Sequence, residues 1–257
     1  MSDFNNIKMI VTDLDGTLLR GDKTISEKTK NVLTSLKKKG IPFGIATARP
    51  IRSVKNFLPF LTYDFAIYHN GAVVMDGGQL CSGFGIDDVY SVIKKLMEEL
   101  PGAHICVEAE DMMYSSFQAE EIWPGFEYIA TEDFHEVVGK IGDKIIIEAT
   151  GSEQFDKIAS IIPDNLYAQM SEGQVVMIMN KNATKINGIK LIVSRYGISL
   201  DDIVAFGDDY NDVCMLEGCG TGVATSNALK EVKQAADFVC ASNEEDGEAD
   251  WIQTYLL

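Results

Sequence analysis

The fold is decided by the stretch Ile10-Val11-Thr12-Asp13-Leu14-Asp15-Gly16-Thr17-Leu18-Leu19, which joins an apolar segment to two aspartates and a glycine. Residues 7–12 have the pattern of a buried strand in a parallel sheet. In an open α/β sheet, ligands bind at the carboxyl ends of the strands. Asp13 and Asp15 at such an end would bind a divalent cation, or divide the roles of nucleophile and general acid. Taken alone, the same two residues also fit a turn after a strand.

A second acidic cluster follows another short apolar strand, far along the chain. Residues 203–206 form this predicted strand, and it runs straight into Gly207-Asp208-Asp209-Tyr210-Asn211-Asp212. Two strands that end in carboxylates at one edge of a sheet would converge on one metal, and such hard oxygen ligands suit Mg²⁺. The alternative is a helix N-terminus with acids that complement its dipole. That alternative does not explain why both strands end alike.

The order of the predicted elements indicates one domain interrupted by another. In the first part strands and helices alternate, and Ser26 is expected to cap a helix that ends at Gly40. Later the pattern mixes hairpins with strand–helix units, which is typical of an α+β module with helices on one sheet face. We therefore predict an α/β fold, with a Rossmann-like parallel-sheet core from residues 1–83 and 184–257 and an inserted α+β domain at 84–183.

Four motifs occur in order along the chain. They are Asp13-Leu14-Asp15-Gly16-Thr17, Thr47 followed by Ala48-Arg49-Pro50, Lys185 within Ala183-Thr184-Lys185-Ile186-Asn187-Gly188, and the run from Gly207 to Asp212. Together they resemble the motifs of the haloacid dehalogenase-like hydrolase superfamily, in its Cof-like sugar-phosphatase branch. That branch carries a large cap domain between the second and third motifs. The resemblance implies that the insertion at 84–183 is this cap.

The resemblance also implies an activity and its catalytic residues. The expected enzyme is a Mg²⁺-dependent phosphatase that hydrolyses phosphate monoesters of small metabolites, sugar phosphates first, through an aspartyl-phosphate. Asp13 would be the nucleophile, and Asp15 would act first as general acid and then as general base. Thr47 and Lys185 would bind phosphoryl oxygens. For Lys185, an exposed helix lysine is the alternative.

Further residues are assigned to the metal and the substrate by the same resemblance. Mg²⁺ would be held by Asp13, the main-chain carbonyl of Asp15 and Asp208, with Asp212 at the metal or acting through its water. The expected substrate-binding residues are Arg49, Asn211, Gly16 and Thr17. Arg49 is equally suited to a plain salt bridge, and Asp209 is expected to be a solvated loop acid.

Two other kinds of function remain open. The first is a phosphomutase or a phosphatase for one cofactor phosphate, within the same superfamily. The second is a non-catalytic metabolite-binding module that retains the fold. The presence of Asp13, Asp15, Thr47, Lys185 and Asp208 argues against this second function.

Composition limits the partners and the location. A formal net charge of −17 argues against nucleic acid or an anionic membrane surface as partner. A phosphorylated substrate would then need a locally positive site, made by Mg²⁺, Lys185, Arg49 and helix N-termini. Five cysteines without metal-ligand or redox spacing indicate reduced thiols in a cytoplasmic protein. No apolar run reaches the ~20 residues of a membrane span. We expect a monomer or small homo-oligomer that acts on a small phosphorylated metabolite.

Overall fold

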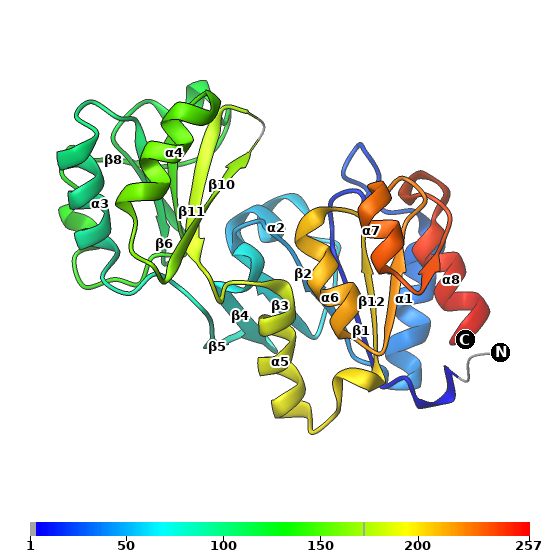
Figure 1. The fold of residues 1–257 in the computed structure, drawn as a ribbon. Coiled ribbons are helices and arrows are strands. Elements are labelled where there is room, and N and C mark those ends of the chain that lie inside the picture. Colours follow the sequence, from blue (N-terminus) through cyan, green and yellow to red (C-terminus); the bar gives the residue numbers. More distant parts are fainter. Residues whose placement is uncertain (1–3, 172) are drawn as a thin grey trace. The chain divides into compact units, whose positions relative to one another are not determined.

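A computed structural model describes residues 4–171 and 173–257 of the chain. The chain divides into two compact units, which are Met1–Gly83 with Thr184–Leu257, and Phe84–Ala183. We call them the core unit and the inserted unit (Figure 1).

The core unit is built on one sheet with the strand order β14-β13-β12-β1-β2-β3-β4-β5. Neighbouring strands from β14 to β3 are parallel, and β4 and β5 add an antiparallel edge. The predicted α/β fold with a parallel-sheet core is confirmed. The strand bounds are β1 Met9–Thr12, β2 Phe43–Ala46, β3 Phe65–Tyr68, β4 Val73–Asp76, β5 Gln79–Ser82, β12 Ile203–Gly207, β13 Thr221–Ala224 and β14 Phe238–Val239.

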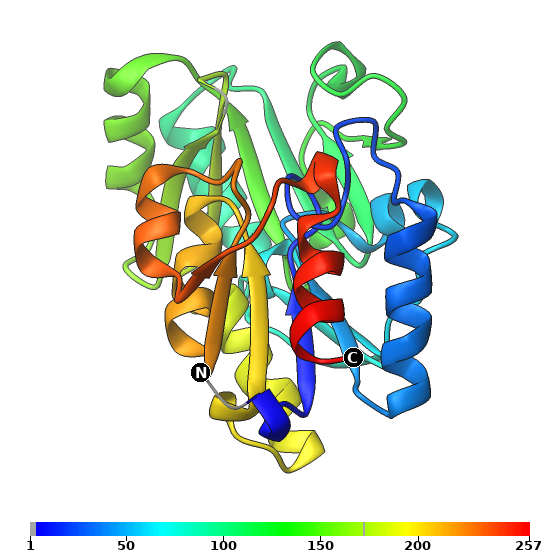
Figure 2. The same cartoon turned by 90° about the vertical axis from the view of Figure 1, so that its right-hand side faces the viewer.

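Helices cover both faces of the core sheet (Figure 2). They are α1 Glu27–Lys39, α2 Ile51–Phe57, α5 Lys185–Tyr196, α6 Val213–Gly218, α7 Lys230–Ala235 and α8 Gly247–Tyr255. Because side chains alternate along a strand, β1 sends Ile10 to one face and Val11 to the other. Ile10 belongs to the apolar cluster formed with α1, α2 and α8, whereas Val11 belongs to the cluster formed with α5, α6 and α7. The parallel strands are therefore buried on both sides.

Helix α1 illustrates how local sequence sets an element. The Ser26 hydroxyl accepts a hydrogen bond from the Thr29 amide at 3.0 Å, which caps the first turn. Gly40 has φ of 72°, a left-handed conformation that glycine adopts without strain, and it ends the helix. The predicted cap and stop of this helix are confirmed.

The inserted unit is an α+β layer with the strand order β10-β11-β9-β6-β7-β8. Its elements are α3 Val89–Glu99, β6 Ile105–Ala109, β7 Met112–Ser115, β8 Ile129–Ala130, β9 Lys144–Glu148, α4 Gly151–Ile161, β10 Leu166–Ser171 and β11 Val175–Asn180. One sheet face packs against α3 and α4. The other face packs against the loop aromatics Phe117 and Trp123. The two α-helices among the described residues of this unit therefore lie on one face of its sheet, as predicted.

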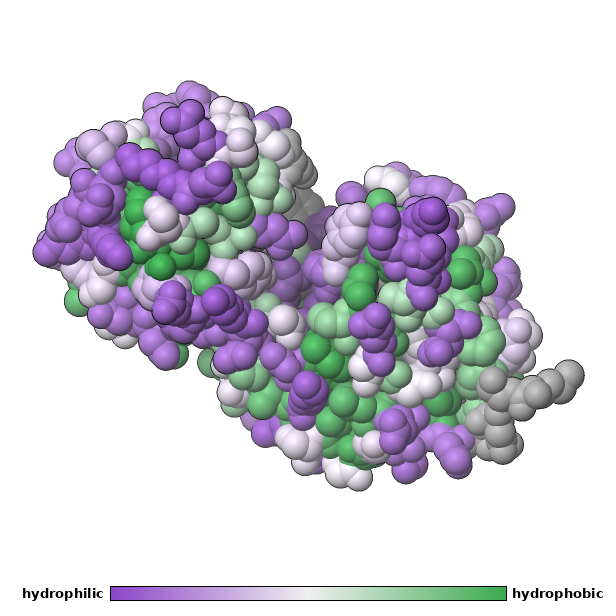
Figure 3. Space-filling view, in the orientation of Figure 1, coloured by the Kyte–Doolittle hydropathy of each residue, from purple (hydrophilic) through white to green (hydrophobic). Residues whose placement is uncertain are grey.

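Charged and polar residues are spread over much of the visible surface of each unit, with apolar residues between them (Figure 3). Within the described ranges, no helix is long and apolar enough to cross a membrane. The five cysteines all lie in those ranges, and each is an unpaired thiol.

Candidate active site

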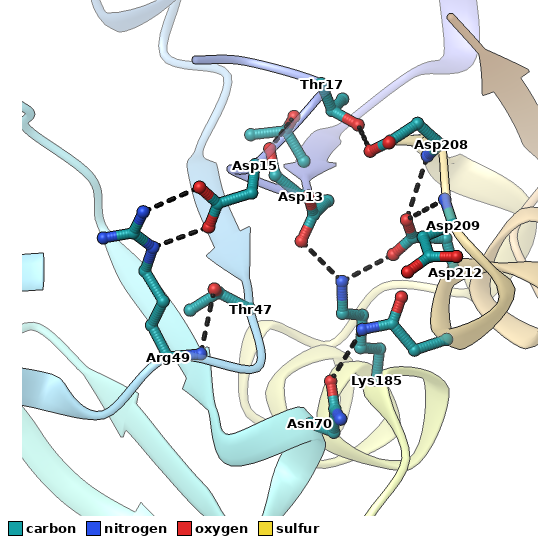
Figure 4. Close-up of polar contacts among 12 residues, drawn as sticks. Asp13, Asp15, Thr17, Thr47, Arg49, Asn70, Lys185, Asp208, Asp209 and Asp212 are labelled. Atoms are coloured by element: carbon teal, nitrogen blue, oxygen red, sulfur yellow. Dashed lines mark hydrogen bonds and ion pairs between the residues drawn. The ribbon is translucent and has the colours of Figure 1, made fainter. Parts of the chain in front are cut away.

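The two predicted acidic clusters meet because β1 and β12 are neighbours in the sheet. The strands pair in parallel with Thr12 opposite Phe206. The next amide, that of Asp13, donates to the Phe206 carbonyl at 3.0 Å. The loop from Gly207 to Asp212 therefore leaves the sheet beside the two aspartates of the first motif (Figure 4). This edge is the carboxyl end of the strands, where open α/β sheets bind ligands.

A tight turn after Asp15 brings the two clusters into direct contact. Gly16 has φ of 84°, and a Cβ at this position would collide with the carboxylate of Asp208. The position therefore requires glycine for both its conformation and its close approach. The next residue, Thr17, donates from its hydroxyl to Asp208 Oδ1 at 2.6 Å. Gly16 and Thr17 were predicted to bind substrate, and the structure places both against Asp208.

Lys185 is the central cation of the site. Its Nζ donates to Asp13 Oδ1 at 2.6 Å and to Asp212 Oδ1 at 2.5 Å, and its side chain is 0% exposed. It occupies the first turn of α5, where Thr184 caps the helix by accepting from the Asn187 amide. Although burial favours the neutral amine, the two carboxylates outweigh this effect and raise the pKa of Lys185. The lysine is therefore a buried cation and not an exposed helix residue.

Of the two carboxyl groups in the first motif, that of Asp13 has its pKa raised. Burial raises its pKa to about 8, with Lys185 opposing this shift and the nearby Asp212 and Asp208 adding to it. The pKa of Asp208 rises to about 6, also mainly through burial. Such shifts mark carboxylates crowded in a site that favours a compensating cation.

Asp212 organises the fourth motif through both of its carboxylate oxygens. While Oδ1 accepts from Lys185, Oδ2 accepts from the amides of Asp208 and Asp209 at 2.9 and 3.0 Å. This holds the start of the loop in place. The Asp209 side chain caps the short helix at Tyr210 from an exposed position. Asp209 thus lies at the surface, as expected of a solvated acid.

Arg49 forms a two-point ion pair with Asp15. Its Nε and Nη2 each donate to one carboxylate oxygen of Asp15 at 2.6 Å, and Lys23 Nζ donates to Oδ1 at 2.7 Å. Burial of Asp15 opposes ionisation, but the hydrogen bonds and charges of Arg49 and Lys23 outweigh it and lower the pKa. Of the two roles weighed for Arg49, the salt bridge is the one present in this structure.

Thr47 and Asn211 lie on the remaining sides of the site. Thr47 follows β2, is buried, and accepts from the Arg49 amide at 3.1 Å through its hydroxyl. Asn211 donates from Nδ2 to Asn70 Oδ1 at 3.0 Å. Asn70 follows β3, and this hydrogen bond places the loop after β3 beside the fourth motif.

The acidic side of the site fits a divalent cation. Asp13, Asp208 and Asp212 each offer a carboxylate oxygen, and these three atoms lie within 4.8 Å of one another. The donor set is oxygen only, which suits Mg²⁺ better than softer metals. The raised pKa values of Asp13 and Asp208 are consistent with a cation site, because a bound cation would offset their burial and mutual repulsion and favour the ionised carboxylates.

Three polar residues near the site were not predicted. Lys23 contacts Asp15, Asn227 donates from Nδ2 to the Gly16 carbonyl at 2.8 Å, and Glu248 contacts Thr12. Each contact depends on a loop or helix that returns to the sheet edge from outside the four motifs. For Glu248 the sequence does hold one signal, since it lies three and four residues before Trp251 and Ile252, a spacing that places an acid on the apolar side of a helix.

Comparisons with known proteins agree with this fold and site. The model of the haloacid dehalogenase-like hydrolase family matches residues 10–252. The chain therefore belongs to the haloacid dehalogenase-like hydrolases, as its four motifs predicted. A curated relative, the 5-amino-6-(5-phospho-D-ribitylamino)uracil phosphatase YitU of Bacillus subtilis, is 31% identical over 96% of this chain and 97% of its own length.

Solved structures extend the similarity to the whole fold. The subclass IIB sugar phosphatase BT4131 of the same superfamily superposes with a TM-score of 0.80 at 25% identity, covering 96% of this chain and 98% of that one. The protein TM0651 from Thermotoga maritima gives a TM-score of 0.84 at 26% identity, covering 96% and 97%.

Proposed function

We propose that this chain is a Mg²⁺-dependent phosphatase that hydrolyses phosphate monoesters of small metabolites, sugar phosphates foremost, through an aspartyl-phosphate on Asp13. The observation that carries the proposal is the buried arrangement of Asp13, Lys185 and Asp212 at the carboxyl end of β1. A carboxylate beside a fixed cation can attack the phosphorus of an anionic ester, because the cation offsets the charge of the incoming phosphate.

In this mechanism each side chain has a separate task. Asp13 attacks phosphorus and the ester oxygen leaves with a proton from Asp15. Water then attacks the phosphorus of the aspartyl-phosphate and Asp15 takes its proton, while the bond from phosphorus to Asp13 breaks and inorganic phosphate leaves. Lys185 and Thr47 bind phosphoryl oxygens. Mg²⁺, held by Asp13, the Asp15 carbonyl and Asp208, would shield the nucleophile from the phosphate charge and stabilise the transition state.

The ion pairs of Asp15 set a condition on the first step. Arg49 and Lys23 lower the pKa of Asp15, which favours the ionised form that the second step needs as a base. For the first step Asp15 must carry a proton. Since the phosphate of a substrate is a competing anion for both cations, we infer that substrate binding releases Asp15 from them and lets it protonate. Arg49 would then contact the substrate.

The inserted unit, residues 84–183, is proposed to be the cap that selects the leaving group. Two similar proteins guide the substrate class. YitU is named as the phosphatase of a phosphoribityl compound, and BT4131 is named as a sugar phosphatase. Both names support phosphate on a polyol or sugar skeleton as the substrate of this chain. A location in the cytoplasm stays a prediction.

Turnover of p-nitrophenyl phosphate, before and after chelation, tests the proposal. We expect activity to stop on chelation and return with Mg²⁺, and Ca²⁺ to substitute poorly because it relaxes coordination number and geometry. A panel of phosphorylated metabolites then ranks the substrates by kcat/KM. Full activity after exhaustive chelation would rule out the metal-dependent mechanism.

A further inference from the structure

A second buried acid lies behind the first motif and has no part in the mechanism described above. Glu248, in the first turn of α8, is 3% exposed. Its Oε2 lies 2.7 Å from the hydroxyl of Thr12, the last residue of β1. Within residues 4–171 and 173–257, Oε1 of Glu248 has no hydrogen-bond partner. A carboxylate in this position would be poorly solvated and poorly paired.

The hydrogen bonds of the Thr12 hydroxyl indicate whether Glu248 is ionised or protonated. The Thr12 hydroxyl also lies 2.8 Å from the main-chain carbonyl of Asp13. A hydroxyl has one proton, and both neighbours of this hydroxyl are acceptors if Glu248 is ionised. One of the two short contacts would then join two lone pairs. If Glu248 carries a proton on Oε2, both contacts become hydrogen bonds.

We propose that Glu248 is a neutral positioning residue, whose carboxylic acid donates to Thr12 so that the Thr12 hydroxyl donates to the main-chain carbonyl of Asp13. This inference rests on the proposed function, because Asp13 is its nucleophile. The amide of Asp13 is already held by Phe206. With its carbonyl held by Thr12, Asp13 is hydrogen-bonded through both its amide and its carbonyl. The backbone of the nucleophile is therefore fixed, and so is the direction in which its side chain leaves the backbone.

The electrostatics of the site agree with a neutral acid. Burial raises the pKa of Glu248 to about 8; the hydrogen bond with Thr12 opposes the rise, and the charge of Asp13 adds to it. Among the described residues, Cys240 also interacts with Glu248: burial raises the pKa of the Cys240 thiol, and the charge of Glu248 adds to the rise. An ionised Glu248 would add a further negative charge to a site that already gathers three carboxylates. The neutral form avoids this repulsion with the incoming phosphate.

The protonation state can be measured without any assay of activity. Protein labelled with ¹³C at the glutamate side-chain carboxyl is compared with the variant Glu248→Gln, and the missing resonance identifies Glu248. At about pH 6 ordinary glutamates are ionised. We expect the Glu248 resonance at the position of a protonated acid. A resonance at the carboxylate position would overturn the proposal, whether or not the protein proves to be a phosphatase.

Two substitutions of Glu248 by side chains of similar size distinguish a role in positioning Asp13 from a role in filling space. Glu248→Gln keeps a donor to Thr12, whereas Glu248→Met fills the space without one. We expect Glu248→Gln to retain kcat within about twofold and Glu248→Met to lower kcat by about tenfold with little change in KM. Thr12→Val, which removes the relay, should match Glu248→Met. The control Asp250→Asn removes one charge from the exposed side of the same helix, and should leave kcat unchanged.

The possible results are distinguishable. If the folded Glu248→Met and Thr12→Val proteins keep full kcat, the positioning role is wrong even though the acid is neutral. If Glu248→Gln is as slow as Glu248→Met, a donor at this position is not what matters. If the unaltered protein hydrolyses no phosphate monoester, the proposed function fails, and the resonance of Glu248 still decides whether the acid is neutral.

Discussion

Lys185 Nζ lies between two buried carboxylates, 2.6 Å from Asp13 Oδ1 and 2.5 Å from Asp212 Oδ1. In a chain with a net charge of −17, this lysine supplies part of the positive charge that the proposed anionic substrate needs, together with the proposed Mg²⁺ and Arg49. The field at the bottom of a site depends on the nearest unscreened charges, whereas surface charges are screened by solvent and salt. One fully buried lysine therefore matters more here than the exposed acids.

The proposed role of Asp13 as nucleophile is tested by Asp13→Asn. The amide has nearly the same shape but is a far weaker nucleophile, so kcat for p-nitrophenyl phosphate should fall by roughly 10³-fold or more. Thermal unfolding should show that the fold is retained. Asp209→Asn is the matched control in the neighbouring motif, because Asp209 is exposed. Near-normal turnover by Asp13→Asn would exclude a covalent role for this residue.

Removing the buried cation should weaken both folding and catalysis. Lys185→Met leaves Asp13 and Asp212 without their shared partner, and breaking a buried ion pair from one side costs about 3–5 kcal/mol of unfolding free energy. Because Mg²⁺ would supply positive charge to the same carboxylates, adding it should recover part of the loss in a urea titration. Lys190→Met, on the exposed face of the same helix, should be close to neutral. Equal stability of the two variants would contradict this account of Lys185.

Lys23 should influence the pH dependence of kcat/KM by changing the pKa of Asp15. Since Lys23 and Arg49 lower the pKa of Asp15, Lys23→Gln should raise it toward its ordinary value. The limb of the kcat/KM profile that reports Asp15 should therefore move to higher pH. Lys30→Gln, which removes an exposed lysine paired with Glu27, is the control. A profile that does not move would show that Lys23 does not act on Asp15 in solution.

Stability should carry the signature of a neutral Glu248. Its pKa is raised from 4.5 to about 8 in the folded protein. Between these values the folded state holds a proton that the unfolded state releases, so this group makes stability fall as pH rises through the window. The slope approaches ~1.4 kcal/mol per pH unit at most. The difference in unfolding free energy between the parent and Glu248→Gln should show this slope, and a flat difference would mean that Glu248 is ionised throughout.

The inserted unit can be removed to test its proposed role in specificity. Gly83 lies against the Ala72 carbonyl, and Thr184 lies against the neighbouring Gly71. The two points of the core unit that flank the insertion, Gly83 and Thr184, are therefore close enough to be joined by a short linker. Deleting residues 84–183 should lower kcat/KM for the best metabolite far more than for p-nitrophenyl phosphate. Asp13→Asn in the shortened protein checks that the remaining turnover comes from the same site. An unchanged ratio in a folded core would place specificity outside the insertion.

Much of the fold was predictable because its signals are local. Apolar runs that end in Asp13 and Asp208 predict strands, and parallel strands bring their carboxyl ends to one edge. The cap at Ser26 and the stop at Gly40 need only a few neighbouring residues. The meeting of the first and fourth motifs followed from such short patterns and a general rule of sheet topology.

Other features depend on packing between distant segments, and only the tertiary structure decided them. The sequence left Arg49 equally suited to substrate and to a salt bridge, and the fold brings it against Asp15. Read alone, Lys185 resembles an exposed helix lysine, yet the helix turns it into the sheet edge between two acids. Glu248 meets Thr12 only because α8 returns to the first strand, and burial there, rather than any motif, makes a neutral acid more stable than a carboxylate.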